Sequence, residues 1–175
     1  MGRKIILNLA MSLDGYIAKK NGDYDWIKGQ GDNSLNTKDK WSYEEFLNDV
    51  DVVLMGRDCY DCGFHKDFAG KKVFVATSKK LEDYDNIHFI DGDIVSIILE
   101  ELKNDGKNIF LFGGGVTLAP FISRDVIDEY IIGIIPVILG KGKRLFAQES
   151  DILLELKLTK YLIDDGILIL RYSKC

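Results

Sequence analysis

The chain has 175 residues, of which 46% are hydrophobic and 29% charged, so its composition is that of a folded globular domain and argues against disorder. Its net charge of −5 at pH 7 argues against nucleic acid or an anionic membrane as a partner, because either would favour a basic surface. No apolar run reaches the ~18–20 residues that a membrane-spanning helix needs.

In the first half of the chain, short apolar runs predict strands and one polar segment predicts a helix. Residues 5–11 form the first expected strand, and a polar, glycine-containing stretch follows to residue 39. Ser42 and Glu45 have the spacing of a capping box, which predicts a helix to about residue 48. Further strands are expected at 52–55, 73–77 and 87–90.

The next segment continues the alternation of helix and strand. Asp93 is a helix cap, and apolar spacing predicts a helix from it to about residue 106. Residues 109–112 form a buried strand that leads into three glycines, and a helix is expected at 116–123. Residues 130–136 form the next strand.

The C-terminal segment has a different pattern. Leucines at 154, 156 and 158 alternate with polar residues, which is the period of a half-exposed strand. Asp165-Gly166 predicts a tight turn into a last strand at 167–172, and hence an antiparallel hairpin. Apolar strands linked by helices predict an α/β fold of three layers with a mostly parallel sheet. We expect one domain spanning 1–175, because no linker or repeat interrupts it.

Cysteine usage and the N-terminus indicate a cytoplasmic protein. The three cysteines, Cys59, Cys62 and Cys175, are an odd number in a chain with an adequate core, which argues against a disulfide framework. The basic N-terminus leads into an apolar run that ends at Asn8, too early for a signal peptide.

The strongest functional signal is the triple glycine, Gly113-Gly114-Gly115, after a strand and before a helix. Glycines let the backbone approach a phosphate, and the helix N-terminus offers free N–H groups and a positive dipole end. At Gly114 we also expect a positive φ. The alternative is a plain tight turn, and the sequence is not the G-x-G-x-x-G fingerprint.

Two other strand ends carry groups suited to phosphate. Gly56 and Arg57 follow one strand, and a guanidinium binds phosphate through paired hydrogen bonds. Thr77, Ser78 and Lys79, followed by Lys80, end another strand and suit the additional phosphate of NADPH. Each could instead be an ordinary solvated turn. Ligands of open α/β sheets bind at the carboxyl ends of strands, where all three motifs fall.

Taken together, the motifs resemble those of the dihydrofolate-reductase-like superfamily. Within it, the chain is most similar to the reductase domain of the bifunctional riboflavin-synthesis deaminase–reductase, in stand-alone form. The resemblance covers nearly the whole chain in order, and it is carried by these stretches: Ala10-Met11-Ser12-Leu13-Asp14-Gly15-Tyr16-Ile17-Ala18, Leu54-Met55-Gly56-Arg57 with Tyr60, Phe112-Gly113-Gly114-Gly115, and Asp128-Glu129-Tyr130 leading to Pro136-Val137-Ile138-Leu139-Gly140-Lys141-Gly142.

The resemblance implies a site for NADPH and a role for each matching position. Ala10 and Ile17 are expected at the nicotinamide ring, and Asp14 is the candidate catalytic residue, for substrate orientation or proton relay. The positions expected to contact the phosphates are Gly56, Arg57, Cys59, Thr77, Ser78, Lys79, Gly113, Gly114, Gly115, Val116 and Thr117.

Two departures from the family pattern limit what is carried over. The family commonly has Thr where this chain has Cys59, and a thiol is a poor donor, so one phosphate contact is left to the backbone N–H. Folate reductases place a carboxylate on the first helix, and neither Glu44 nor Glu45 is aligned securely with it. The sequence therefore does not favour a folate substrate.

Other readings of the sequence remain open beside the reductase. Cys59 and Cys62, with His65, have the spacing of a thiol–disulfide centre, although a zinc site lacks a nearby fourth ligand. A dinucleotide-binding module without turnover is the second alternative. We expect no metal site.

We expect hydride transfer from NADPH to a small heterocyclic substrate, pterin- or aminopyrimidine-like, as in 5-amino-6-(5-phosphoribosylamino)uracil reductases. The hairpin is expected to expose an apolar edge around 167–170. Such edges are usually covered, which, with the resemblance, favours a homodimer.

Overall fold

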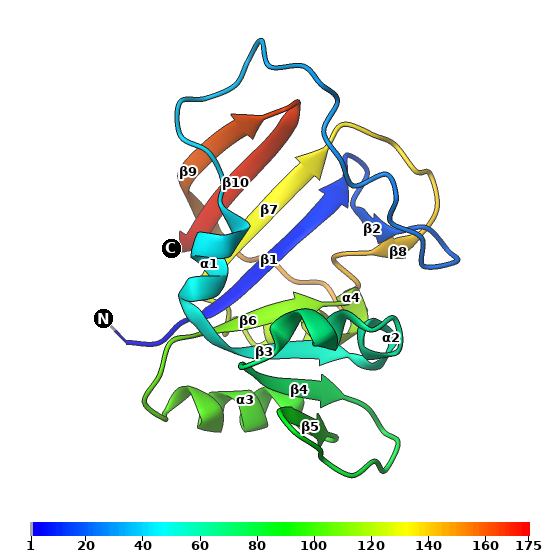
Figure 1. Ribbon diagram of the computed structural model, residues 1–175, viewed down its shortest axis with the longest axis vertical. Helices are drawn as coiled ribbons and strands as arrows, with labels where there is room; N and C mark the ends of the chain where they lie inside the picture. Colours follow the sequence, from blue (N-terminus) through cyan, green and yellow to red (C-terminus); the bar gives the residue numbers. More distant parts are fainter. Residues whose placement is uncertain (1) are drawn as a thin grey trace.

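An eight-stranded sheet runs through the centre of the computed structural model, which describes residues 2–175 (Figure 1). The strand order is β5-β4-β3-β6-β1-β7-β10-β9. The strands of this sheet are β1 (Ile5–Ser12), β3 (Val50–Gly56), β4 (Lys72–Ala76), β5 (Ile87–Ile90), β6 (Asn108–Gly113), β7 (Glu129–Ile135), β9 (Leu156–Asp164) and β10 (Ile167–Lys174).

The strand directions confirm the mostly parallel sheet with an antiparallel C-terminal hairpin. β5, β4, β3, β6, β1 and β7 pair in parallel, and β10 lies antiparallel between β7 and β9. The edge strand on the hairpin side is therefore β9, with β5 at the other edge, and β10, with residues 167–170, is paired on both sides. The expectation of an exposed edge at 167–170 is wrong, because β10 pairs with β7 on one side and with β9 on the other.

Helices cover both faces of the sheet and complete the three layers. α1 (Tyr43–Asn48), α2 (Arg57–Asp61) and the 3₁₀ helix η1 (Phe64–Phe68) lie on one face, and α3 (Ile94–Leu102) and α4 (Gly115–Ser123) on the other. Two apolar clusters, one for each face, form the core. On the α1 face, buried Phe110 packs edge-to-face against Phe46, with ring centroids 4.9 Å apart.

The helix starts show why these segments form where the sequence predicts them. Ser42 Oγ accepts the N–H of Glu45 at 3.1 Å and so caps α1. Asp93 Oδ1 accepts the N–H of Ser96 at 3.1 Å and caps α3. Each of these caps satisfies one backbone donor that the helix itself leaves free.

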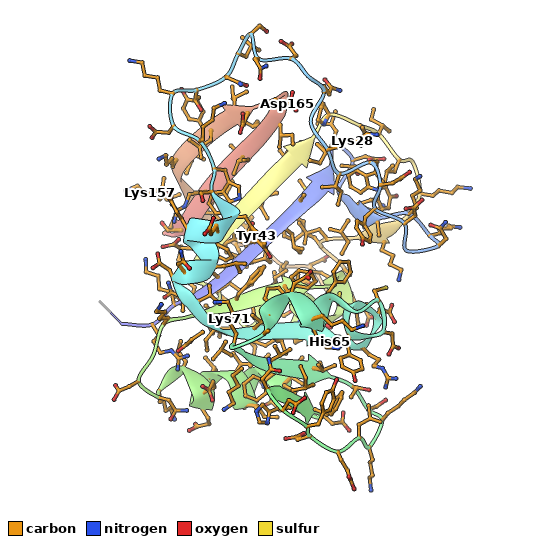
Figure 2. The ribbon with its side chains drawn as sticks, in the orientation of Figure 1. Lys28, Tyr43, His65, Lys71, Lys157 and Asp165 are labelled. Atoms are coloured by element: carbon orange, nitrogen blue, oxygen red, sulfur yellow. The ribbon has the colours of Figure 1, made fainter. Side chains whose placement is uncertain are left out.

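A small second sheet and one long loop complete the chain. β2 (Tyr16–Ala18) pairs antiparallel with β8 (Lys143–Arg144). The loop from 19 to 42 crosses the tip of the β9–β10 hairpin, where Lys28 and Asp165 lie near the end of β7 (Figure 2). The backbone N–H of Gln30 donates to the carbonyl of Asp165 at 3.0 Å, so this loop is fastened to the hairpin.

Between residues 2 and 175, no helix combines the length and the hydropathy needed to cross a bilayer.

Candidate active site

The carboxyl ends of the parallel strands meet along one edge of the sheet. β1, β3, β4, β6 and β7 end there, and their order in the sheet places the end of β3 between those of β4 and β6. Gly56 is in register with Ala76, and its neighbour Met55 with Gly113. Parallel pairing thus brings the three predicted phosphate motifs, which are far apart in the sequence, to adjacent positions.

Two helices begin at this edge without a side-chain cap. α2 starts after Gly56 and α4 after Gly114, and neither glycine can supply a capping oxygen. In contrast, α1 and α3 are capped by Ser42 and Asp93. The first-turn N–H groups of α4 therefore remain available to an anion, and the helix dipole favours a negative charge at that point.

The glycines allow close approach between these elements. A Cβ on Gly56 would lie 2.4 Å from Oγ1 of Thr117, so the start of α4 packs directly on the end of β3. A Cβ on Gly115 would lie 2.1 Å from the carbonyl oxygen of Arg144. Both positions therefore exclude larger residues for reasons of packing.

The other two glycines of the motif differ from the sequence expectation. Gly113 has φ +126°, a conformation that favours glycine, and its peptide bond to Gly114 is cis. Gly114 has φ −85°, so the expectation of a positive φ at Gly114 is wrong. A Cβ there would meet only Cδ1 of Ile17, at 3.6 Å, so the backbone and the packing would accept a side chain at Gly114.

Arg57, at the start of α2, carries a buried donor that the rest of the described chain does not use. Its Nε donates to Oδ1 of Asp61 at 2.7 Å, and its guanidinium lies over the ring of Tyr60 at 5.7 Å. Nη1 is buried and has no hydrogen-bond partner among the described residues. A buried guanidinium N–H without a partner is costly, so Arg57 is a candidate to bind an anionic group.

The third motif lies beyond the end of β4. Thr77 Oγ1 accepts the backbone N–H of Lys79 at 3.2 Å, and Ser78 and Lys79 are exposed. The loop that follows is tied to α2, because the hydroxyls of Tyr60 and Tyr84 are 2.9 Å apart. The motif is thus held beside α2, and the exposed Lys79 ammonium pairs with no carboxylate within residues 2–175.

Two predicted contact residues have side chains unsuited to a polar contact. Val116 is 83% exposed in the first turn of α4 and can offer a backbone N–H but no side-chain donor. Burial raises the pKa of the Cys59 thiol to about 11, so it is a neutral thiol at pH 7. Cys59 and Cys62 are both free, and the high pKa of Cys59 argues against a thiol–disulfide centre.

The predicted nicotinamide residues lie on β1 and β2. Ala10 is in register with Gly133 of β7, and Ile17 lies against Gly114. Both side chains are partly accessible beside the glycine motif. The structure therefore brings Ala10 and Ile17 to the edge that carries the two free helix starts.

Asp14 fastens two loops to each other. Its Oδ1 accepts the hydroxyl of Ser12 at 2.6 Å and the N–H of Leu139 at 3.1 Å, and its Oδ2 accepts the N–H of Gly140 at 2.7 Å. The hydrogen bond from Ser12, followed by those from the backbone, lowers the pKa of Asp14. The carboxylate is thus ionised at neutral pH and holds the β1–β2 turn against the loop after β7.

Lys143 and Arg144, which the sequence motifs did not single out, also reach this edge. Lys143 Nζ pairs with Oδ2 of Asp58 on α2 at 3.1 Å, and the Arg144 guanidinium lies over the Tyr16 ring at 5.2 Å. Their signal is the basic, glycine-containing run after residue 139. Trp26 is 8% exposed, and its buried Nε1 has no partner among the described residues; it lines a cavity of about 640 Å³ with Pro136 and Val137.

The glutamates of α1 and the histidines take no part in this edge. Glu44 and Glu45 are exposed, and Glu45 lines a different groove. His65 Nδ1 lies 3.2 Å from the carbonyl oxygen of Tyr60, while His88 pairs with Asp83. No group of three potential metal ligands occurs within residues 2–175.

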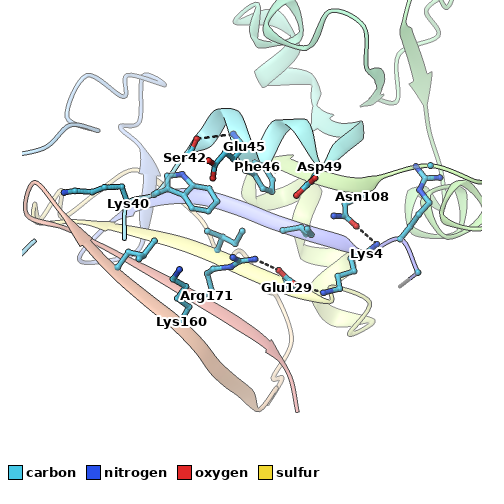
Figure 3. A pocket seen from close by; sticks show the side chains of 17 residues that line it. Lys4, Lys40, Ser42, Glu45, Phe46, Asp49, Asn108, Glu129, Lys160 and Arg171 are labelled. Carbon is cyan, nitrogen blue, oxygen red and sulfur yellow. Dashed lines mark hydrogen bonds and ion pairs between the residues drawn. The ribbon is translucent and has the colours of Figure 1, made fainter. Parts of the chain in front are cut away.

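That groove, with a cavity of about 520 Å³, lies between α1 and the amino ends of the strands (Figure 3). Its charged residues satisfy one another or close neighbours: Lys4 and Arg171 both pair with Glu129, and Lys160 pairs with Asp39. Ligands of parallel sheets bind at the carboxyl ends of strands. We therefore place the candidate site at the opposite edge, where donors remain free.

Comparison with known proteins agrees with this architecture. The model of the RibD C-terminal domain family matches residues 3–168. The chain is 33% identical to YyaP of Bacillus subtilis (strain 168), an uncharacterized protein, over 82% of this chain and 80% of that protein. It is 35% identical to YwjB of the same organism, also uncharacterized, over 91% of this chain and 92% of that protein.

Solved structures share the fold over nearly the whole chain. A protein of Shewanella sp. PV-4, provisionally described as a riboflavin biosynthesis protein, has a TM-score of 0.81 and 29% identity, covering 98% of this chain and 99% of that one. A bifunctional deaminase/5-amino-6-(5-phosphoribosylamino)uracil reductase of Thermotoga maritima has a TM-score of 0.73 and 19% identity, covering 99% of this chain and 57% of that one.

Dihydrofolate reductase of Enterococcus faecalis, complexed with NADP(H), has a TM-score of 0.65 and 13% identity, covering 98% of this chain and 96% of that one. The chain belongs to the RibD C-terminal domain family and has the dihydrofolate-reductase-like fold.

The Asp14 hydrogen bonds predict a loop-specific effect of Asp14→Asn. Asparagine keeps one acceptor oxygen and turns the other into a donor, so at least one loop N–H loses its partner. Amide exchange at Leu139 or Gly140 should accelerate roughly tenfold or more, and the melting temperature should fall. Hydrogen-exchange NMR measures the first, with the exposed Asp151→Asn as control.

The same carboxylate predicts a pH dependence for this difference. Because the folded pKa of Asp14 is lowered, its stabilising effect is complete above the ordinary value of 3.8 and is lost as the pH falls through the folded value. The difference in melting temperature between wild type and Asp14→Asn should shrink in that range. A constant difference would contradict the assignment.

Proposed function

We propose that this member of the RibD C-terminal domain family is an NADPH-dependent reductase of a small heterocyclic substrate, pterin- or aminopyrimidine-like. The observation that carries the proposal is the pair of uncapped helix starts at Gly56 and Gly114, together with the buried Nη1 of Arg57 at the start of α2, which has no hydrogen-bond partner within residues 2–175. The names of the related structures support it, since two are reductases and one of these is complexed with NADP(H).

The residues present fit a dinucleotide phosphate at this edge. The N–H groups of Gly115, Val116 and Thr117 would bind the pyrophosphate, and Arg57 Nη1 would donate to it. Gly56 allows the start of α4 to pack on the end of β3, and Gly113 supplies the positive φ before α4. Cys59 would contribute its backbone N–H. Ser78 and Lys79, beside Thr77, would bind the additional phosphate of NADPH.

The nicotinamide end of the site would lie on Ala10 and Ile17. When bound, NADPH supplies the hydride, and the protein contributes binding and orientation. Asp14 would act as a positioning residue, because its lowered pKa makes it a poor acid at neutral pH and its oxygens hold the loop at Leu139 and Gly140. The proton for the substrate would then come from another donor, most simply water.

The whole activity is tested by NADPH oxidation with a panel of pterins, aminopyrimidine ribosides and quinones. Turnover with one heterocycle and not with quinones is the expected result. Binding of NADPH without turnover of any of them would favour a regulatory dinucleotide-binding module instead.

Gly114→Val is predicted to abolish NADPH binding while the fold remains. A Cβ at this position has space, and its φ of −85° is accessible to valine, but the side chain would stand where the backbone must meet phosphate. Calorimetry with NADPH and circular dichroism measure the two effects. If the folded variant bound NADPH with the wild-type affinity, the glycines would form only a turn and no phosphate site.

NADPH is predicted to bind more tightly than NADH. Loss of a charge-assisted contact costs about 1.5–3 kcal/mol, so Lys79→Ala should weaken NADPH binding roughly ten- to hundredfold and leave NADH unchanged. The exposed Lys20→Ala is the matched control. Equal affinity of wild type for both cofactors would rule out a phosphate site at Thr77–Lys80.

We also propose that residues 1–175 work as one domain, in the cytoplasm, and as a homodimer. The edge strand β9 has nine residues, and Leu158 and Tyr161 on it are 49% and 58% exposed. A long exposed edge with apolar side chains is a pairing surface, and twofold dimers are the commonest closed assembly.

Light scattering at micromolar concentration should give about twice the chain mass of 19.8 kDa. Leu158→Lys should shift the protein toward the monomer, because it places a charge on the pairing surface. A wild-type monomer under these conditions would contradict the dimer.

A further inference from the structure

Gly133 lies in the interior of β7, between two paired strands. It is in register with Ala10 of β1 and with Ile169 of β10. Glycine weakens the interior of a strand, because it loses the most backbone entropy on folding and has no side chain to pack. Its presence at the centre of this sheet therefore needs a cause.

Neither the backbone nor the packing requires glycine here. The φ of Gly133 lies outside the left-handed region, and a Cβ would be 3.8 Å from atoms of Ala10 and Ile167, which is ordinary contact distance. At Gly56 and Gly115, by comparison, a Cβ would clash at 2.4 and 2.1 Å. The protein itself would accept alanine at 133.

The space above Gly133 lies on the α1 face of the sheet. Ile6 and Ile131 belong to the core on that face, so the alternation of side chains puts Asn8, Ala10 and Gly133 on it as well. All three are partly exposed. α1 lies over the amino halves of β1 and β7, and no helix of residues 2–175 covers their carboxyl halves on this face (Figure 1).

Asn8 adds a polar group to this small surface. It lies in a central strand, where asparagine is unfavourable, and its side-chain amide makes no hydrogen bond within residues 2–175. The amide presents both a donor and an acceptor. The partly exposed ring of Phe112 lies on the same face, two residues along β6 from Phe110.

We propose that Gly133 is a specificity-determining residue of the active site. Its missing side chain, next to Ala10, leaves a flat floor on which the heterocyclic ring of the substrate lies, with Asn8 bonding to a lactam or amidine edge of that ring. This rests on the proposed function, because the floor lies beside the expected nicotinamide position. It selects a flat, neutral ring with a donor and an acceptor side by side.

Two probe ligands test the floor directly, 6-methylpterin and 5,6-diaminouracil. Each is titrated into ¹⁵N-labelled protein with and without saturating NADPH. One of them should bind and shift the amide resonances of Gly133 and Asn8. If neither binds at millimolar concentration in either state, the floor is not a heterocycle site.

The variants Gly133→Ala and Gly133→Val test the role of the missing side chain. Affinity for the bound probe should fall at least about tenfold for alanine and further for valine, while NADPH affinity stays within twofold. Both variants should melt at or above the wild-type temperature, because the strand gains a side chain. Gly2→Val, where a Cβ meets nothing within 4 Å, is the matched control.

The outcomes separate this proposal from the proposed function. If the wild-type protein bound a probe but not NADPH, the proposed NADPH-dependent reductase activity would be contradicted, whereas ring binding at Gly133 would be supported. Loss of NADPH affinity in Gly133→Ala, with probe affinity unchanged, would mean that nicotinamide occupies the floor and would overturn the proposal. Unchanged probe affinity in both variants would overturn it too.

Discussion

The close contact between the end of β3 and the start of α4 is the constraint on which the site depends. Thr117 packs directly against Gly56, and Gly115 packs against the backbone at Arg144. These contacts fix the start of α4 at the sheet edge, and because its N-cap is Gly114, no N-cap side chain within residues 2–175 bonds to the first N–H groups of the helix. The packing at this edge thus presents the uncapped start of α4 where the proposed phosphate site lies.

Contacts at the same edge of the sheet hold the loop after β7 in place. Asp14 ties it to the β1–β2 turn, and β8 carries Arg144 back to Gly115. The loop after β7, with β8, therefore contacts both the nicotinamide end and the phosphate end of the proposed site. A substitution in this loop is therefore expected to alter the geometry at both ends of the proposed site. For this reason, loop geometry and cofactor affinity need separate measurements in any variant.

The sequence predicted the elements well because their signals are local. Ser42, Asp93 and the apolar runs determine where helices and strands begin, and the hairpin follows from Asp165-Gly166. The glycine and arginine motifs could also be recognised from the sequence, since few structural roles need Gly113-Gly114-Gly115 after a strand. The resemblance to a reductase family rests on these same local motifs, and the family assignment confirms it.

What the sequence by itself determined was the order of the main-sheet strands and of the helices α1, α3 and α4, the mostly parallel sheet and the choice of phosphate-binding candidates, but not the short elements β2, α2, η1 and β8. Tertiary structure alone decided which glycine carries the positive φ, that β9 and not residues 167–170 forms the edge on the hairpin side, and that Lys143 and Arg144 lie at the candidate site. It also placed Asn8 and Gly133 on one surface. The physical reason is that strand pairing and close contact join residues more than a hundred positions apart, and neither composition nor periodicity records such pairs.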